Sequence, residues 1–267
     1  MEEMKIIILA AGRGSRLSPL TDDKPKCMVN LFGKSLLKWQ IDLFRKVGIN
    51  DISIVTGYKN ELIKFEDVKL FHNQNFETTN MVETLFCAED QFSDTVIVSY
   101  GDIIFEEDAL KKLIKSDDEF SIIVDKNWEK LWSIRNENLL DDAESLKINS
   151  EGHITTIGQK VLNKSDIQAQ YIGLMKFQKN ATKHIKKFYS DMKKQSKNGT
   201  NPLNSKIPFE RSYFTDLLNG LINKGFKLKA TPIEGGWLEL DTVKDYEIYN
   251  KMYKNGTILK IINLKKM

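Results

Sequence analysis

A short segment near the amino terminus combines glycines with cations. Gly12 and Gly14 follow the apolar run at residues 6–9, and Arg16 and Lys26 come after them. Glycine lets the main chain approach a ligand closely, and consecutive free N–H groups in such a loop form a concave site for an anion. Arg16 can add a forked donor set that matches phosphate oxygens, and Lys26 a compact charge. The segment therefore predicts a phosphate-binding loop.

Two familiar phosphate loops do not match this segment. The dinucleotide fingerprint needs a third glycine where Leu17 stands, and a Walker pattern ending at Ser35 needs one where Met28 stands. A turn that merely joins a strand to a helix would explain the two glycines. It would not explain the spacing of Arg16 and Lys26, so the phosphate-binding interpretation is favoured.

Two aspartates are placed to bind a divalent cation. Asp102 follows the apolar segment 96–99, and Asp241 stands two residues after Glu239, before a predicted helix. Ligands of open parallel sheets bind outside the carboxyl ends of the strands, so Asp102 should emerge beside the glycine loop. Two carboxylates suffice for Mg²⁺ when phosphates and waters complete its octahedron. Either aspartate alone could instead cap a helix or a turn.

The other potentially reactive side chains indicate no second catalytic set. His72, His153 and His184 have no ligand-like spacing, and no Ser–His or Cys–His arrangement is evident. Cys27 and Cys87 fit neither a disulfide framework nor a metal site, so we expect both to be small buried residues.

Composition predicts an ordinary globular protein. The 267 residues are 41% hydrophobic and 29% charged, which allows one large core, with or without an appended lobe. The net charge of +3 is too small to indicate nucleic acid or an anionic membrane as a partner. The first residues are unlike a signal peptide, and no stretch approaches the roughly 20 apolar residues of a membrane span. We therefore expect a cytoplasmic protein that binds neither nucleic acid nor membrane.

Alternating strand and helix patterns position these residues. They predict one α/β domain over residues 1–267, with a Rossmann-like, mostly parallel central sheet flanked by helices. Ser35 and Asn80 can cap the helices that follow them. Strands are predicted at residues 6–9, 52–56, 68–71, 96–99, 120–124, 171–177 and 226–232, and helices at 35–47, 60–64, 81–88, 108–115, 181–192, 213–223 and 243–252.

Several segments fall outside this alternation. Residues 146–149 and 154–157 predict a hairpin. We expect it to form a small lid, within about residues 125–170, over a second ligand site that is called the acceptor site below. Residues 125–135 show no clean period of either kind. The polar stretch 194–208 is expected to be the most mobile loop, and residues 258–264 a terminal strand or strap.

The glycine segment resembles the signature LAAGxGxRLxPLT, followed by PK, of the nucleotidyltransferases with a sugar-nucleotide pyrophosphorylase-like fold. These enzymes join a nucleoside triphosphate to a phosphorylated small molecule. The family's metal-binding aspartates occur in GD or AD and in E-[IL]-D-[TS], which match residues 101–102 and 239–242. The resemblance implies a catalytic role for Arg16 and Lys26, nucleotide binding by Leu9, Ala11, Gly12 and Gly14, and Mg²⁺ binding by Asp102 and Asp241.

Residues 79–85 resemble the Asn-rich loop of the CTP-using branch, and the motifs usual in sugar-nucleotide members are missing. That branch activates phosphocholine, aminoethyl- or hydroxyethylphosphonate and, in bacterial capsule phosphoramidate synthesis, glutamine phosphate. The resemblance implies a cytidylyltransferase that acts in capsule or surface polysaccharide modification and reads cytosine near Ala11, Asn80 and Thr84. Thr79 replaces the first of the family's paired asparagines. A sugar-1-phosphate nucleotidyltransferase and a non-catalytic nucleotide-binding module are the alternatives.

The acceptor is expected to lie near an aromatic and charged segment. Lys126, Trp128, Trp132 and Arg135 follow a strand end and precede the predicted lid, and Glu239 belongs to the second metal motif. Both tryptophans could simply pack the lid against the sheet. A guanidinium suits a carboxylate, so an acceptor with a second anionic group is favoured over phosphocholine if Arg135 points inward.

Overall fold

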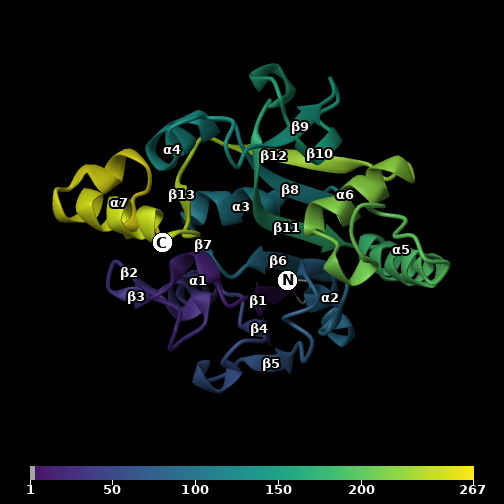
Figure 1. Cartoon of the computed structure of the whole chain (residues 1–267), viewed down its shortest axis with the longest axis horizontal. Coiled ribbons are helices and arrows are strands. Elements are labelled where there is room, and N and C mark those ends of the chain that lie inside the picture. Colours follow the sequence, from purple (N-terminus) through teal and green to yellow (C-terminus); the bar gives the residue numbers. More distant parts are fainter. Residues whose placement is uncertain (1–3) are drawn as a thin grey trace.

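A seven-stranded sheet forms the centre of the computed structural model, which describes residues 4–267 (Figure 1). Its order is β12-β8-β11-β6-β1-β4-β5, and only β11 runs antiparallel to its neighbours. The predicted α/β class with a mostly parallel sheet is confirmed. The strands are β1 (Met4–Ala10), β4 (Asp51–Thr56), β5 (Lys69–His72), β6 (Thr95–Tyr100), β8 (Phe120–Asp125), β11 (Gln170–Gln178) and β12 (Leu228–Ile233).

Strand β1 lies inside the sheet, and its apolar residues belong to two hydrophobic cores. Ile6 and Ile8 belong to one hydrophobic core, and Ile7 and Leu9 belong to the other. Successive side chains of a strand point to opposite faces, so a strand that is covered on both faces must be apolar without interruption.

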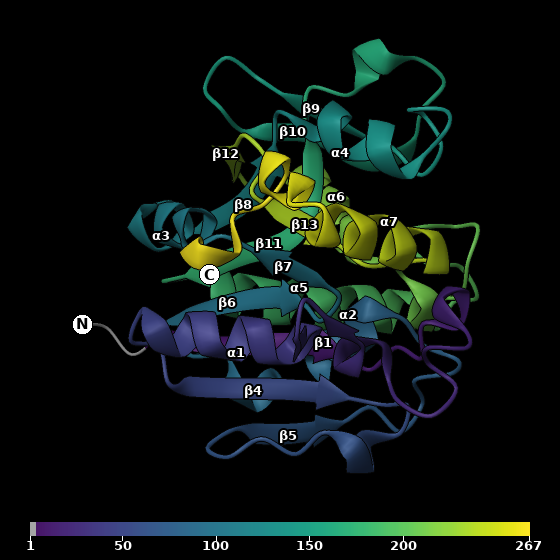
Figure 2. The same cartoon turned by 90° about the vertical axis from the view of Figure 1, so that its left-hand side faces the viewer.

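Helices pack on both faces of the sheet. Helices α1, α3, α4 and α7 contribute to one core, and α2, α5 and α6 to the other; Figure 2 shows α1 lying along the sheet. Over residues 4–267, none of the helices combines the length and apolarity that crossing a membrane requires. The helices are α1 (Leu36–Lys46), α2 (Met81–Phe86), α3 (Glu107–Lys115), α4 (Trp128–Arg135), α5 (Ala181–Ser196), α6 (Phe214–Asn223) and α7 (Val243–Lys254).

Both predicted caps are present. The Ser35 side chain accepts from the main-chain N–H of Lys38 at the start of α1, and Asn80 Oδ1 accepts from Met81 N at the start of α2. Each cap satisfies a backbone donor that has no partner within its helix. A short antiparallel pair, β2 (Asn30–Leu31) with β3 (Lys34–Ser35), leads into α1.

A separate antiparallel pair joins the middle of the chain to its end. Strand β7 (Ile103–Phe105) pairs with β13 (Trp237–Glu239), with Ile103 opposite Glu239. Leu240 N also donates to Asp102 O over 3.0 Å. This pairing brings the residues that follow β6 next to those that follow β13.

The predicted hairpin is confirmed as β9 (Glu144–Ile148) and β10 (Ile154–Lys160). It packs closely on the first turn of α6: a β-carbon added at Gly158 would lie 2.2 Å from Thr215 Cβ. Gly158 also has a φ of +74°, which favours glycine. A hairpin held in this way can border a cavity, and its opening and closing as a lid stays a prediction.

Residues 125–135 contain helix α4, which the sequence interpretation missed. Its buried residues are Trp128, Leu131, Trp132 and Arg135, at the i, i+3, i+4 and i+7 spacing of one helix face. The period was obscured because an arginine occupies one of the four buried positions.

The end of the chain forms short 3₁₀ turns at Thr257–Lys260 and Leu264–Lys266, so the expectation of a strand there is wrong. The alternative of a strap fits, because Gly236 N donates to Ile261 O and Asn263 N to Glu106 Oε1. Residues 60–62 likewise form a 3₁₀ turn instead of an α-helix.

Two smaller expectations concern Cys87 and the polar loop. Cys27 is buried as expected, but Cys87, the residue that ends α2, is exposed. Within residues 194–208, Asn201 is buried and donates to Ser212 Oγ, which anchors the middle of that loop. Its mobility stays a prediction.

At Gly57, just after β4, the chain passes against the glycine loop. A β-carbon there would lie 2.5 Å from Ala11 O and 2.7 Å from Phe76 Cβ. We expect Gly57→Ala to lower the free energy of unfolding, measured with urea, by about 1–3 kcal/mol, as overpacking does. Gly12→Ala is the matched control, since a β-carbon at Gly12 meets nothing within 4 Å. Equal stability of the two variants would contradict this close approach.

Candidate active site

The glycine loop is folded so that Lys26 lies against Gly14. Gly14 has a φ of +75°, and a β-carbon there would lie 2.8 Å from Lys26 Cβ. The buried side chain of Thr21 donates to Gly14 O over 2.9 Å and closes the loop on itself. Gly14 is therefore needed for the position of Lys26, because any other side chain would displace the lysine.

The Lys26 ammonium bridges the two predicted metal-binding aspartates. Its Nζ lies 2.7 Å from Asp102 Oδ2 and 2.7 Å from Asp241 Oδ1. Arg16 Nη2 lies 2.7 Å from Asp241 Oδ2. The lysine side chain is 13% exposed and that of Arg16 65%, so one cation is enclosed and the other faces solvent. Four residues predicted from three motifs thus form one ionic cluster.

The charges in this cluster shift one another's ionisation. Burial opposes the charged form of Lys26, but the carboxylates of Asp102, Asp241 and Glu239 raise its pKa above the ordinary range. Burial would raise the pKa of Asp241, but Lys26 and Arg16 outweigh it and hold that pKa below its usual value. Lysine and aspartate are therefore both charged at neutral pH.

The pairing of β7 with β13 and a buried side chain place the two aspartates. Asp102 directly precedes β7, and Asp241 follows β13 by two residues. Asp245 Oδ2 accepts from the main-chain N–H groups of Asp241 and Thr242, and Thr242 caps α7 through Asp245 N. Asp241 is thus fixed by a strand on one side and a capped helix on the other.

The donor set fits a divalent cation that takes further ligands from a substrate. Asp102 Oδ1 is buried and has no hydrogen-bond partner, so one oxygen remains available beside the cluster. Within residues 4–267, no group of three or more His, Cys, Asp and Glu side chains could hold a metal unaided. Two carboxylates suit Mg²⁺ only when phosphate oxygens and waters complete its coordination.

A small cavity of ≈ 120 Å³ lies beside the cluster, and five of the six predicted nucleotide-binding residues line it. Gly14 is the exception, since it supports Lys26 instead. The cavity separates the glycine loop from the start of α2. Its lining comprises Leu9, Ala10, Ala11, Gly12, Lys26, Cys27, Phe76, Thr79, Asn80, Met81, Thr84, Gly101 and Asp102.

Two residues near this cavity are not among the site residues predicted from the sequence. Phe76 lines the cavity and packs edge-on against Tyr58. Asn73, at the end of β5, is buried and bonded to several loop groups. Both lie between the predicted strand at residues 68–71 and the predicted helix at 81–88, where the sequence indicates no regular element. The signal that could have identified Asn73 is its place directly after a strand, at the edge of the sheet where ligands bind.

A larger cavity of ≈ 1090 Å³ opens on the other side of the cluster. Met81 lines both cavities, and Arg16 reaches from the larger one to Asp241. Carboxylates outnumber cations on its walls. The charged residues that line it are Asp141, Asp142, Glu144, Asp216 and Glu239, and Arg16, Lys160 and Lys206.

Among the carboxyl groups that line this cavity, those of Glu144 and Glu239 have the most strongly raised pKa values. The side chain of Glu144 reaches solvent within the cavity, yet the surrounding protein and the carboxylates of Asp142, Asp216 and Glu239 raise its pKa to about 7. A positively charged ligand would relieve this crowding of negative charge.

The predicted acceptor residues separate into two groups. Trp132 and Glu239 line the larger cavity, whereas Lys126 is exposed and lies outside its lining. Trp128 is buried against the Trp132 ring, which agrees with a packing role.

Arg135 is 3% exposed, and its guanidinium is occupied by carboxylates of its own chain. Nε lies 3.0 Å from Asp245 Oδ1, and Nη1 lies 2.9 Å from Glu239 Oε2. This geometry revises the expected role: Arg135 holds Glu239 in place and is not a free fork for an acceptor carboxylate.

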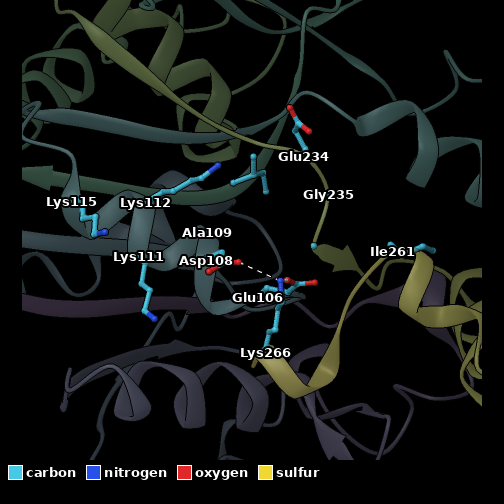
Figure 3. A pocket seen from close by; sticks show the side chains of 12 residues that line it. Glu106, Asp108, Ala109, Lys111, Lys112, Lys115, Glu234, Gly235, Ile261 and Lys266 are labelled. Atoms are coloured by element: carbon cyan, nitrogen blue, oxygen red, sulfur yellow. Dashed lines mark hydrogen bonds and ion pairs between the residues drawn. The ribbon is translucent and has the colours of Figure 1, made fainter.

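A third hollow, of ≈ 460 Å³, lies between α3 and the end of the chain (Figure 3). None of the site residues predicted from the sequence lines it. Its lysines are largely paired: Lys112 donates to Pro232 O, and Lys266 lies 3.4 Å from Glu106. This hollow is therefore separate from the residues that the sequence indicates for chemistry.

The fold and the site define a nucleotidyltransferase. Residues 6–165 match the MobA-like NTP transferase domain, and the chain belongs to this family. It is 41% identical, over 92% of its own length and 98% of the other's, to the CTP:phosphoglutamine cytidylyltransferase of Campylobacter jejuni subsp. jejuni serotype O:2. It is 32% identical to the choline-phosphate cytidylyltransferase of Streptococcus pneumoniae over 42% of this chain and 51% of that one.

Solved structures share the fold. The CTP:phosphocholine cytidylyltransferase from Streptococcus pneumoniae superposes with a TM-score of 0.70 at 22% identity, over 94% of this chain and 99% of that one. The inositol-1-phosphate CTP transferase from T. maritima gives a TM-score of 0.69 at 21% identity, over 98% of both chains.

Removing the shared cation should destabilise the fold in a pH-dependent way. The lowered pKa of Asp241 contributes stability above its unfolded value of about 3.9, and this is lost as pH falls through the folded pKa. In Lys26→Met that pKa should rise, because burial is then opposed mainly by the solvent-exposed Arg16. The loss should be about 3–5 kcal/mol near neutral pH and should shrink on acidification.

Urea denaturation at about pH 7.5 and about pH 5 measures this difference. Lys24→Met is the matched control, because Lys24 belongs to the same loop but pairs with an exposed Asp23. A loss that is the same at both pH values, or no loss, would contradict the shared charge.

Proposed function

We propose that this protein is a CTP-dependent cytidylyltransferase that joins CTP to phosphoglutamine and releases pyrophosphate. The observation that carries the proposal is the bridge from Lys26 to Asp102 and Asp241, which lies beside a small cavity lined by the glycine loop and near a larger, acidic one. Similarity to the phosphoglutamine enzyme over nearly its whole length supports the choice of substrates. We further propose a cytoplasmic role in capsule or surface polysaccharide modification.

The reaction requires positioning and charge neutralisation more than covalent chemistry. A phosphate oxygen of the acceptor attacks the α-phosphorus of CTP in line, a new P–O bond forms, and the bond to the β-phosphate breaks. Lys26 and Arg16 stabilise negative charge on the phosphates and on the departing pyrophosphate. Lys26 is prepared for this role because its neighbours keep it protonated.

Mg²⁺ is the proposed cofactor, held by Asp102 and Asp241. When bound, the ion would supply the positive charge that lets two anions approach each other. The family generally uses a divalent metal, and the unpartnered Asp102 Oδ1 gives this chain a free ligand oxygen.

The larger cavity suits an acceptor that carries an ammonium group. Phosphoglutamine has an α-ammonium and an α-carboxylate besides its phosphoryl group. We assign the ammonium to Glu144 and its neighbouring carboxylates, and the phosphoryl group to the vicinity of Arg16. Phosphocholine also carries a cation, so it is the acceptor to compare first.

The proposed reaction is tested by following pyrophosphate release. We expect CTP with phosphoglutamine and Mg²⁺ to react faster than CTP with phosphocholine or UTP with a sugar 1-phosphate. EDTA, Asp102→Asn and Asp241→Asn should each abolish turnover, and Lys26→Met should lower it by about 10²-fold or more. Faster reaction with UTP and a sugar 1-phosphate would overturn the assignment, as would full activity in EDTA.

The proposed role of Glu144 makes acceptor binding pH-dependent. Its pKa of about 7 means that the carboxyl gains charge as pH rises through neutrality. The KM for phosphoglutamine should therefore fall between about pH 6 and about pH 8. Glu144→Gln should weaken this dependence and leave the part due to Glu239, whose pKa burial also raises to about 7. Glu151→Gln, at the exposed hairpin tip, is the control. A pH profile that Glu144→Gln leaves unchanged would exclude this role.

A further inference from the structure

We propose that Asn73 is a positioning residue that sets nucleotide specificity. It would do so by holding the base-facing loop, residues 74–80, against the nucleotide cavity. The inference rests on the proposed function, since it concerns how cytosine is told from uracil.

Asn73 is 3% exposed, and every hydrogen-bonding group of its side chain is used. Nδ2 donates to Thr79 Oγ1 over 2.9 Å and to Thr84 Oγ1 over 3.0 Å, and Oδ1 accepts from Asn75 N over 3.0 Å. Its main-chain N–H donates to Thr56 O at the end of β4. Through its main-chain N–H and its side-chain amide, Asn73 thus joins the sheet to the beginning of the loop, to its end and to α2.

The two threonines that accept hydrogen bonds from Asn73 donate further hydrogen bonds to the main chain. Thr79 Oγ1 donates to Asn75 O over 2.9 Å, which closes the loop. Thr84 Oγ1 donates to Asn80 O over 3.1 Å, which fixes the residue that caps α2. Because the Thr84 hydroxyl is engaged on both sides, it acts here as a link between Asn73 and Asn80.

The loop that is held in this way forms one wall of the nucleotide cavity. Phe76, Thr79 and Asn80 line the cavity opposite Ala11 and Gly12. Asn80 N also donates to Glu210 O, so the far end of the loop has a second anchor. Asn73 is the anchor on the side of the sheet.

Discrimination between two bases depends on fixed donors and acceptors. Cytosine offers an amino donor where uracil offers an acceptor, so groups at set positions must accept from one and reject the other. A site that holds such groups rigidly rejects the wrong ligand strongly, because mismatched polar groups stay unpaired. A loop released from Asn73 could adjust to either base, and discrimination would decrease.

The experiment compares Asn73→Ala with the unmodified protein, using CTP and UTP separately at saturating acceptor. We expect the KM for CTP to rise about tenfold and the CTP-over-UTP preference in kcat/KM to fall about tenfold. The KM for the acceptor should change less than about threefold. Asn250→Ala is the matched control, because the Asn250 amide donates to Tyr246 O within α7.

Thr79→Val and CTP binding by calorimetry separate positioning from folding. Thr79 is half-buried, so Thr79→Val should fold, keep its Tm and still weaken CTP binding and base preference. If Asn73→Ala does not fold, Asn73→Asp decides, since the aspartate loses both donated bonds but keeps the acceptor and, unlike Thr79, residue 73 does not line the cavity.

The outcomes distinguish two failures. Unchanged CTP affinity and base preference in folded Asn73 and Thr79 variants would overturn the positioning role while the proposed function stood. Equal loss of acceptor and nucleotide affinity would also overturn it, by indicating a general structural defect. If the unmodified protein used CTP and UTP equally, the proposed function would fail, and a specificity role for Asn73 with it.

Discussion

The ammonium of Lys26 allows two enclosed carboxylates to remain charged and close together. Asp102 and Asp241 each lie 2.7 Å from its Nζ, and without that charge they would repel each other in a site with little water. The dependence is mutual, because the carboxylates also keep the lysine protonated. Cation and anions are thus already assembled in the folded chain, as electrostatic catalysis at the proposed site requires.

The rest of the fold places these three residues. The position of Lys26 requires a glycine at residue 14, because the lysine side chain lies against it. Asp102 follows β6, which pairs directly with β1. Asp241 is brought from the distant end of the chain by the β7–β13 pair and is fixed by Asp245. Asp245 also binds Arg135, which holds Glu239 at the wall of the larger cavity. One buried carboxylate therefore connects the Lys26 cluster to the wall of the larger cavity.

Local sequence patterns predicted much of this arrangement because they reflect local physics. The apolar run of β1, the glycines after it and the aspartates near strand ends are short-range signals. The rule for parallel sheets placed Asp102 beside the glycine loop. Those signals could not predict that Arg135 pairs with Asp245, since that contact joins residues 110 positions apart. Helix α4 was missed because its buried face includes the same arginine, whose charge is balanced only in the folded protein.

The smaller cavity likewise combines residues that could be predicted from motifs with residues that could not. Their motifs predicted that Leu9, Ala11 and Asn80 lie together, whereas the role that we propose for Asn73 depends on knowing its hydrogen-bond partners. A single asparagine in a polar stretch carries no periodicity, and three of its bonds join groups up to eleven residues away. Side chains that support a site from behind are therefore the hardest to find from sequence.

The most direct test is a crystal structure with a non-hydrolysable CTP analogue and Mn²⁺, located by its anomalous signal. We predict one Mn²⁺ ion bound by Asp102 and Asp241, with the cytosine in the cavity lined by Ala11 and Asn80 and the triphosphate beside Lys26 and Arg16. A triphosphate in the hollow lined by Lys111, Lys112 and Lys115, or Mn²⁺ bound away from both aspartates, would contradict this assignment.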